Sequence, residues 1–167
     1  RHCSSQAYDT IRQEPRQGVY PMKSYLSHLE CTSCGQLFPH EQAMGTCSTC
    51  GKVLFARYDL ASAKKHVQPH DFVKRQSSMW RFFELMPVIN PSNVISLGEG
   101  GTPLLKAANL GKSLDLKNLY VKDEGLNPTG SFKSRGISAA VSKAKELNKQ
   151  AITMPTAGNA GGALAAY

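Results

Sequence analysis

The chain has 167 residues, of which 41% are hydrophobic and 19% are charged. These values are typical of a globular protein and exclude disorder as the default state. The formal net charge is +8 at pH 7, and nucleic acid is the usual partner of so basic a chain. Residues 1–83 carry 11 basic and 6 acidic side chains, however, and residues 84–167 carry 9 and 6. Because no basic run stands out, we expect no nucleic-acid partner and a surface compatible with a small anionic substrate.

The composition also bears on where the protein is located and on whether it spans a membrane. No apolar run approaches the roughly 18 residues that a membrane span needs, so we expect no membrane partner. Five cysteines are present, and the metal spacing of four of them favours a reducing compartment, the cytoplasm. The chain starts at Arg1 rather than Met and stops at Tyr167 inside an expected helix, so both ends are expected to be truncated.

The first half of the chain divides into three parts. Residues 1–27 are polar and contain Pro15, Gly18 and Pro21, which predicts an irregular lead-in. Residues 28–59 hold the paired cysteines and form a compact unit. Residues 60–94 are expected to contain a polar linker over 60–71 and then a helix over 72–86. That helix is predicted because five residues fall close to one face: Phe72, Arg75, Met79, Phe83 and Met86.

Residues 95–167 have a different rhythm. A glycine-rich turn at 98–101 precedes a predicted strand over 119–123, a helix over 132–148, a second strand over 151–154 and a helix from 158 onward. The helix over 132–148 has the clearest period, with Ile137, Ala140, Val141, Ala144 and Leu147 on one face. Strand and helix in alternation predict an α/β layer with parallel strands.

The cysteines carry the strongest metal signal. Cys31 and Cys34 form one pair, Cys47 and Cys50 form another, and 12 residues separate the pairs. Each pair is followed by glycine, which lets backbone N–H groups approach the sulfurs. Four thiolates complete a tetrahedral Zn²⁺ site with no open position, so the sequence predicts a structural zinc in a zinc-ribbon-like module. A disulfide or a vestigial pair is the alternative.

Other residues near the cysteines receive weaker interpretations. His40 lies between the pairs and is interpreted as a surface loop histidine rather than a fifth ligand. Cys3 is assigned no role. Residues 36–44 are not a basic and aromatic patch, which favours scaffolding over nucleic-acid binding, although a non-catalytic zinc-ribbon binding module stays an alternative.

The stretch from Lys122 to Gly136 predicts a strand end, a tight turn and a helix start, with Lys133 in the first helical turn and Ser131 as a candidate N-cap. There the helix macrodipole and Arg135 would lower the pKa of Lys133, which suits an amine that forms an imine. An ordinary solvated lysine is the alternative. Lys122 and Glu124 are interpreted as surface charges at the strand end.

Three segments carry a resemblance to a known family. Residues 127–133 read NPTGSFK, residues 97–104 read LGEGGTPL, and residues 156–167 read TAGNAGGALAAY. They resemble, respectively, the lysine motif, the entry loop and the asparagine loop of fold-type-II pyridoxal-phosphate enzymes, and of threonine synthases in particular. The tetracysteine unit is similar to that of many bacterial and archaeal threonine synthases. The resemblance covers roughly residues 28–167 and implies an α/β fold, with residues 95–167 as the incomplete N-terminal part of the catalytic domain.

The resemblance also implies a chemistry. Lys133 would hold pyridoxal phosphate as an imine and move protons, and Asn159 would hydrogen-bond the phenolic oxygen of the cofactor. The substrate carboxylate would be received by the loop at the next helix N-terminus. The reaction would convert O-phosphohomoserine and water to threonine and phosphate, in a homodimer when full length. The substrate-binding residues implied are Thr156, Ala157, Gly158, Asn159 and Ala160.

Two departures and two rivals accompany the resemblance. Ser134 stands where the family usually has Asp, and Thr156 and Ala160 stand where its asparagine loop commonly has other residues. Cysteate synthases and threonine or serine dehydratases share the lysine motif, so they are the alternative functions. The family's phosphate-gripping loop has no counterpart in these residues. If the two predicted strands are parallel neighbours, we expect Lys133 and Asn159 to face one another across a shared cleft.

Overall fold

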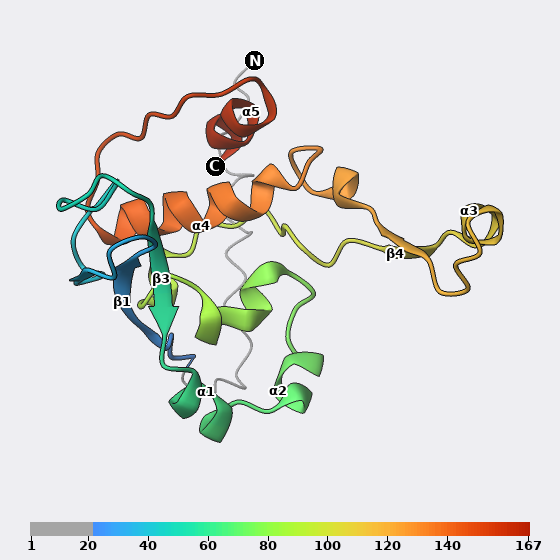
Figure 1. Ribbon diagram of the computed structural model, residues 1–167, viewed down its shortest axis with the longest axis horizontal. Helices are drawn as coiled ribbons and strands as arrows, with labels where there is room; N and C mark the ends of the chain where they lie inside the picture. Colours follow the sequence, from blue (N-terminus) through green and yellow to red (C-terminus); the bar gives the residue numbers. More distant parts are fainter. Residues whose placement is uncertain (1–21) are drawn as a thin grey trace, which may run out of the picture.

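The computed structural model describes residues 22–167 (Figure 1). The predicted lead-in covers residues 1–27, and its residues 1–21, which include Cys3, lie outside the described residues. Its last two residues, 26 and 27, already belong to a strand that begins at Leu26. Within the described part, no helix is both long and apolar enough to cross a membrane. The described residues form a small cysteine-bearing sheet, a compact helical centre and a projecting two-stranded arm (Figure 1).

The cysteine-bearing sheet has three antiparallel strands in the order β2-β1-β3. They are β1 (Leu26–Cys31), β2 (Leu37–Phe38) and β3 (Leu54–Tyr58). The two cysteine pairs lie in the turns that leave β1 and approach β3, so the sheet and the cysteine cluster depend on each other. Arg57 Nε donates to Glu30 Oε2 at 2.6 Å across β1 and β3.

The segment that follows, for which the sequence predicts a polar linker over 60–71, is largely helical. It holds α1 (Leu60–His66) and α2 (Pro69–Val73). Asp59 caps α1, because its Oδ1 accepts from the backbone N–H of Ser62 at 2.9 Å. In α2, Gln68 and Asp71 form a capping box ahead of a proline at the first position. These capping residues are visible in the sequence, but they were not recognised because the whole segment is polar.

The single helix predicted over 72–86 is also wrong. After α2 the chain turns and forms a 3₁₀ segment, η1 (Met79–Leu85), with a non-helical φ of −102° and ψ of 35° at Phe82. The physical reason is a competing acceptor: the Met79 N–H donates to the carbonyl of Glu99 at 2.8 Å instead of to the preceding helical turn. The resulting bend buries one compact apolar cluster of Met79, Trp80, Phe83 and Val88.

The arm consists of β4 (Leu104–Lys106), α3 (Ala108–Ser113) and β5 (Tyr120–Lys122), reached through a short turn, η2 (Pro91–Asn93). The strand predicted over 119–123 is therefore confirmed, but it pairs antiparallel with β4 rather than in a parallel layer. Figure 1 shows the arm extending away from the rest of the molecule.

Two helices end the chain. A 3₁₀ turn, η3 (Glu124–Leu126), leads into the lysine loop and then into α4 (Lys133–Glu146), and α5 (Asn159–Ala166) follows. Both helices were predicted, and they pack against one another. The strand predicted over 151–154 is wrong, because residues 151–156 are neither helix nor strand. A strand needs a neighbour to satisfy its backbone groups, and no backbone hydrogen bond from another strand reaches this segment within residues 22–167.

Candidate functional site

The four cysteines meet at one point. The Sγ atoms of Cys31, Cys34, Cys47 and Cys50 all lie within 4.8 Å of one another. The Cys31–Cys50 distance is 3.4 Å, Cys34–Cys47 is 3.7 Å and Cys34–Cys50 is 3.6 Å. Four sulfurs about 2.3 Å from one zinc ion would lie about 3.8 Å apart. The cluster is therefore of a size that can bind a metal ion, and the predicted convergence of the four residues is confirmed.

The backbone around the cysteines suits thiolates. Gly35 and Gly51 have positive φ values of 72° and 70°, and their N–H groups donate to the carbonyls of Cys31 and Cys47 at 3.2 and 2.8 Å. Backbone N–H groups, that of Cys34 first, lower the pKa of the Cys31 thiol to about 6.

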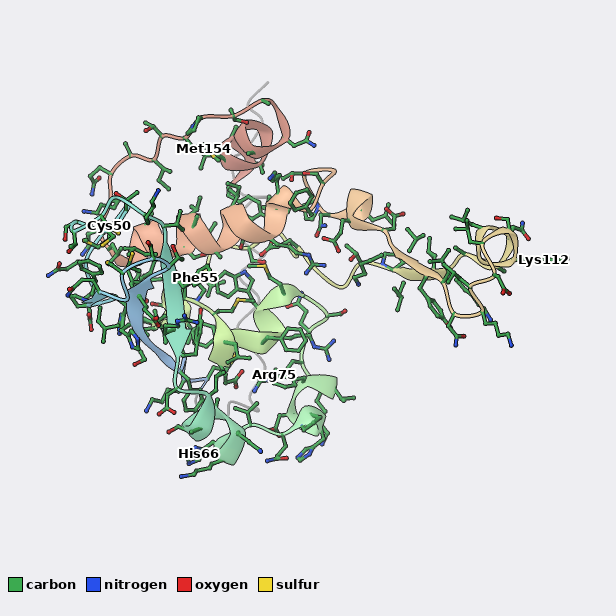
Figure 2. All side chains as sticks on the ribbon, viewed as in Figure 1. Cys50, Phe55, His66, Arg75, Lys112 and Met154 are labelled. Atoms are coloured by element: carbon green, nitrogen blue, oxygen red, sulfur yellow. The ribbon has the colours of Figure 1, made fainter. Side chains whose placement is uncertain are left out.

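The four sulfurs also oppose one another. Although the backbone N–H of Lys52 favours the Cys50 thiolate, the neighbouring sulfurs, Cys31 first, raise the pKa of Cys50 to about 12. Crowding four such groups without a cation is unfavourable, so the donor set has the chemistry of a tetrathiolate metal site. Figure 2 shows Cys50 on the opposite side of the molecule from Lys112, which lies at the tip of the arm.

His40 is not the exposed loop residue that the sequence suggested. Its side chain is 14% exposed, and its Nδ1 is buried without a hydrogen-bond partner among the described residues. The reason is tertiary: His40 lines a cleft of about 590 Å³ between the cysteine-bearing sheet and α4, together with Leu29, Met44 and Ala144. The loop between the cysteine pairs and the helix that begins at Lys133 therefore line the same cleft.

The lysine loop is a tight, hydrogen-bonded turn. Gly130, at a positive φ of 70°, donates its N–H to the carbonyl of Asn127 at 2.8 Å. Ser131 Oγ accepts the N–H of Lys133 at 3.3 Å, but the N-cap of α4 is Phe132, so the prediction of Ser131 as the N-cap is wrong by one position. The Lys133 ammonium lies 4.4 Å from the centre of the Phe132 ring. Among residues 22–167 no carboxylate forms an ion pair with Lys133, so its amine is not held by an acidic partner there.

Glu124 is not the simple surface charge that the sequence suggested. Its carboxylate accepts from Arg135 Nε at 2.7 Å and from Arg135 Nη2 at 2.8 Å. It also accepts from Thr102 Oγ1 at 2.6 Å and from Asn127 Nδ2 at 2.9 Å. The Arg135 hydrogen bonds, with those of Thr102 and Asn127, lower the pKa of Glu124 to about 2. This one carboxylate therefore joins the entry loop, the lysine loop and α4, and it neutralises the arginine beside Lys133.

Lys122 is likewise engaged, because its Nζ donates to the backbone carbonyl of Thr102. Lys122 is nevertheless exposed at the last residue of β5, which agrees with its interpretation as a surface charge at the strand end. No rule based on spacing connects Lys122 to Thr102 or Glu124 to Arg135, because the first pair meets only when β4 and β5 pair and the second meets only across the lysine loop. The sequence signal that was missed is the polarity of the loop itself, with Asn127, Thr129 and Ser131 around the turn.

Ser134, which departs from the resemblance, has a defined structural role. It is fully buried, and its Oγ lies 2.6 Å from Thr129 Oγ1 and accepts the backbone N–H of Thr129 at 3.3 Å. A hydroxyl oxygen thus supplies the acceptor that fixes the turn onto the first turn of α4.

The asparagine loop is exposed and capped by its own threonine. Thr156 Oγ1 accepts the N–H groups of Gly158 at 3.1 Å and Gly161 at 2.8 Å. Gly158 has a φ of 142°, a conformation that favours glycine. Asn159, Ala157 and Thr156 are exposed, and Ala160 is half-buried. The predicted substrate residues therefore share the start of one helix, while the cleft that Lys133 and Asn159 are expected to share stays a prediction.

The Glu124 cluster gives a testable expectation. We expect Glu124→Gln to lower the free energy of unfolding at pH 7 by about 2 kcal/mol, since hydrogen bonds to a charged group are lost. The folded pKa near 2 lies below the ordinary value of 4.5, so the stabilisation is present above pH 4.5 and is lost as pH falls toward 2. Urea unfolding between pH 7 and pH 2 should show this acid-dependent loss in the wild type and a weaker one in the variant. Asp115→Asn, at an exposed position, is the control, and equal acid profiles for both variants would contradict the assignment.

Comparison with known proteins gives the chain its family. The model of the family described as "Pyridoxal-phosphate dependent enzyme" matches residues 95–167. Residues 95–167 belong to this family. It is 42% identical over 137 residues to a threonine synthase of Methanocaldococcus jannaschii, and 39% identical over 140 residues to one of Methanosarcina acetivorans. A threonine synthase of Halalkalibacterium halodurans is 46% identical over 95 residues.

These relatives are much longer than the chain. The matched regions cover 82% and 84% of this chain but 34% of each archaeal relative, and 54% of this chain but 27% of the Halalkalibacterium relative. The chain thus spans about a third of the length of the archaeal relatives that it matches. The resemblance to fold-type-II pyridoxal-phosphate enzymes and the α/β fold class are confirmed.

Proposed function

We propose that this chain is the N-terminal part of a threonine synthase that acts on O-phosphohomoserine. The observation that carries the proposal is the geometry of Lys133, the first residue of α4, whose amine has no acidic partner among residues 22–167. It follows a loop that is fixed by Asn127, Gly130 and Ser134. The extent of the identity to threonine synthases supports the same conclusion. A cytoplasmic, homodimeric enzyme is part of the proposal.

The residues present fit pyridoxal phosphate. Lys133 supplies the amine that would hold it, and the exposed start of α5 supplies Asn159 and a helix N-terminus suited to anions. When bound, the cofactor supplies an electron sink for cleavage at the substrate carbons. Lys133 would also move protons, and the loop from Thr156 to Ala160 would receive the substrate carboxylate. The fixed turn at Ser134 keeps the lysine in one place while these groups act.

Zinc is the proposed occupant of the cysteine cluster. Four thiolates with no other ligand favour Zn²⁺ in a structural role, because no position stays open for catalysis. The cleft between the cysteine-bearing sheet and α4 gives the metal module a place to support the helix that carries Lys133. The module is therefore assigned to scaffolding, and Cys31, Cys34, Cys47 and Cys50 are its ligands.

A hybrid enzyme tests the proposal directly. Residues 28–167 would replace the aligned third of the Methanocaldococcus jannaschii threonine synthase, and the hybrid would be assayed with O-phosphohomoserine, threonine, serine, and O-phosphoserine with sulfite. We expect phosphate release and threonine formation from O-phosphohomoserine, with little deamination of threonine or serine. Preferential deamination would favour a dehydratase, and preferential use of O-phosphoserine with sulfite would favour a cysteate synthase.

A further inference from the structure

A buried carboxylate lies between the two helices that carry the proposed site. Glu99 of the entry loop is fully buried, yet within residues 22–167 no cation pairs with it. A buried carboxylate is costly unless hydrogen bonds satisfy it. The hydrogen-bond donors to this carboxylate therefore identify the segments that it connects.

The first carboxylate oxygen faces the core and α4. Glu99 Oε1 accepts from Trp80 Nε1 at 2.8 Å, from Ser138 Oγ at 2.5 Å and from Ser96 Oγ at 3.0 Å. Ser138 lies on α4, a little more than one turn after Lys133, and is fully buried. One oxygen thus fixes the entry loop to the apolar cluster and to the helix that begins at Lys133.

The second carboxylate oxygen faces α5. Glu99 Oε2 accepts from the Leu97 N–H at 2.9 Å and from the Tyr167 hydroxyl at 2.6 Å. Burial and the hydrogen bond to Glu99 raise the pKa of Tyr167, so the phenol stays a donor at neutral pH. Burial alone raises the pKa of Glu99, but the hydrogen bonds from Ser138 and Tyr167 outweigh it and hold the pKa below its ordinary value.

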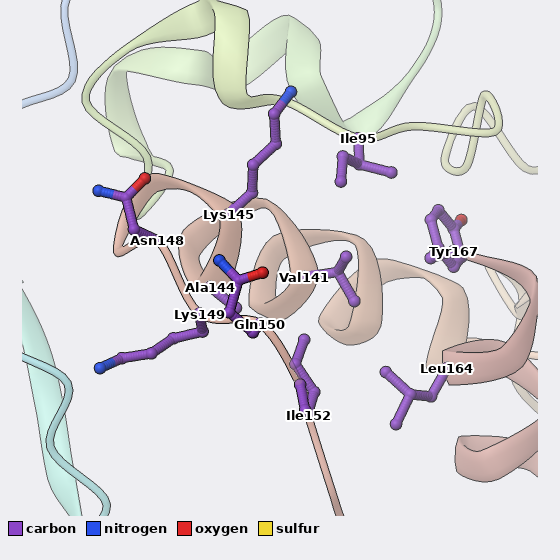
Figure 3. A pocket seen from close by; sticks show the side chains of 11 residues that line it. Ile95, Val141, Ala144, Lys145, Asn148, Lys149, Gln150, Ile152, Leu164 and Tyr167 are labelled. Atoms are coloured by element: carbon purple, nitrogen blue, oxygen red, sulfur yellow. The ribbon is translucent and has the colours of Figure 1, made fainter.

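The C-terminal end of α5 lies beside a cleft and follows a segment that is in no sheet. Figure 3 shows Tyr167 and Leu164 on one side of a cleft of about 520 Å³, with Val141 of α4 on the other side. The segment that leads to α5, residues 151–156, belongs to no sheet. The Glu99–Tyr167 hydrogen bond is therefore the polar tie between the far end of α5 and the entry loop.

We infer that Glu99 is a positioning residue that sets α5, and with it Asn159, relative to α4 and Lys133. This inference rests on the proposed function for its consequence in cofactor binding. A single carboxylate joins the helix that begins at Lys133 to the end of the helix that begins at Asn159. The Tyr167 hydroxyl is the link that can be removed without disturbing Trp80 or Ser138.

Tyr167→Phe is the test, with pyridoxal phosphate as the probe. We expect the apparent Kd, from absorbance titration, to rise about tenfold, the change expected for one hydrogen bond to a charged acceptor. Hydrogen exchange of the amides in α5 should become faster. The indole N–H signal of Trp80, the one tryptophan in the chain, should stay in place, because its acceptor oxygen is unchanged. Tyr120→Phe on the exposed arm is the matched control.

A double variant separates positioning from general destabilisation. If Glu99 acts through Asn159, then Tyr167→Phe should have no further effect on cofactor affinity in an Asn159→Ala background. An equal tenfold loss in that background would overturn the inference, and so would unchanged affinity and exchange in the single variant. Glu99→Gln should reproduce the effect of Tyr167→Phe and also shift the Trp80 indole signal.

The outcomes also separate this inference from the proposed function. If the wild type takes up no pyridoxal phosphate at Lys133, the proposed function fails for this chain. Exchange in α5 then decides the inference alone. Faster exchange in Tyr167→Phe and in Glu99→Gln would support the role of Glu99 in placing α5, and unchanged protection in both would overturn it.

Discussion

Lys133→Ala is expected to leave the chain without a borohydride-stable pyridoxal phosphate label. In the wild type, reduction in the presence of the cofactor should place the label at Lys133, because that lysine begins α4 on the fixed turn that the proposal assigns to the cofactor. In the hybrid enzyme the same change should abolish visible cofactor absorbance. It should also lower activity by at least the roughly 10²–10⁴-fold that a lost proton-transfer group costs. Peptide mass spectrometry and steady-state kinetics measure the two effects.

Lysines elsewhere provide the controls for this experiment. Lys143 forms an ion pair with Glu146 at 2.7 Å, and Lys149 is exposed near the end of α4. Lys149→Ala should keep the label and the absorbance. Unchanged labelling in Lys133→Ala, or labelling spread evenly over the lysines of the wild type, would remove the central residue from the proposal.

Replacing one cysteine of the cluster is expected to have the largest effect on folding. In Cys47→Ser, zinc content should fall from about one equivalent to near zero, and residues 26–58 should lose protection from hydrogen exchange. Binding of a structural zinc contributes roughly 10–16 kcal/mol in small metal-folded modules. That is comparable to the total stability of about 5–15 kcal/mol of an ordinary domain, so we expect the small sheet to unfold when the metal is lost. Elemental analysis and exchange mass spectrometry report the two losses.

Thr49→Ala, inside the same cysteine turn but without a ligand atom, is the matched control and should retain the metal. Removal of metal by a chelator should reproduce the effect of Cys47→Ser in the wild type. If reduced wild-type protein contains no zinc, the cluster has no structural metal. A mass two units lower, with no alkylation of a cysteine pair, would instead support the disulfide alternative.

Local patterns predicted what depends on local forces. The helix over 132–148 was recognisable because its apolar residues repeat with the helical period, and α4 covers Lys133–Glu146. The cysteine site was recognisable because two tight turns with glycine at positive φ hold the sulfurs without help from distant residues. The helix from Asn159 to Ala166 needed only its small-residue composition and the loop ahead of it.

Distant contacts set the features that local patterns missed. The bend at η1 exists because the carbonyl of Glu99 captures the N–H of Met79, 20 positions earlier in the chain. The ion pair between Glu124 and Arg135 joins residues on either side of the lysine loop, which no helical or strand spacing aligns. The segment at 151–154 has the composition of a strand, but pairing partners rather than composition make a strand. For α1 and α2, capping signals were present that sequence reasoning could have used.

The arm has a consequence for how the protein behaves in concentrated solution. Strands β4 and β5 pair only with each other among the described residues, and their outer edges carry backbone groups that can template another chain. Leu104, Leu105, Tyr120 and Val121 are each 46% or more exposed, so edge-to-edge association would also bury apolar surface. The lysines interspersed along the arm repel a second copy. Colloidal stability therefore rests on charge, and added salt, which screens that repulsion, should drive self-association through the arm before the helical centre unfolds. The lysines that oppose it are Lys106, Lys112, Lys117 and Lys122.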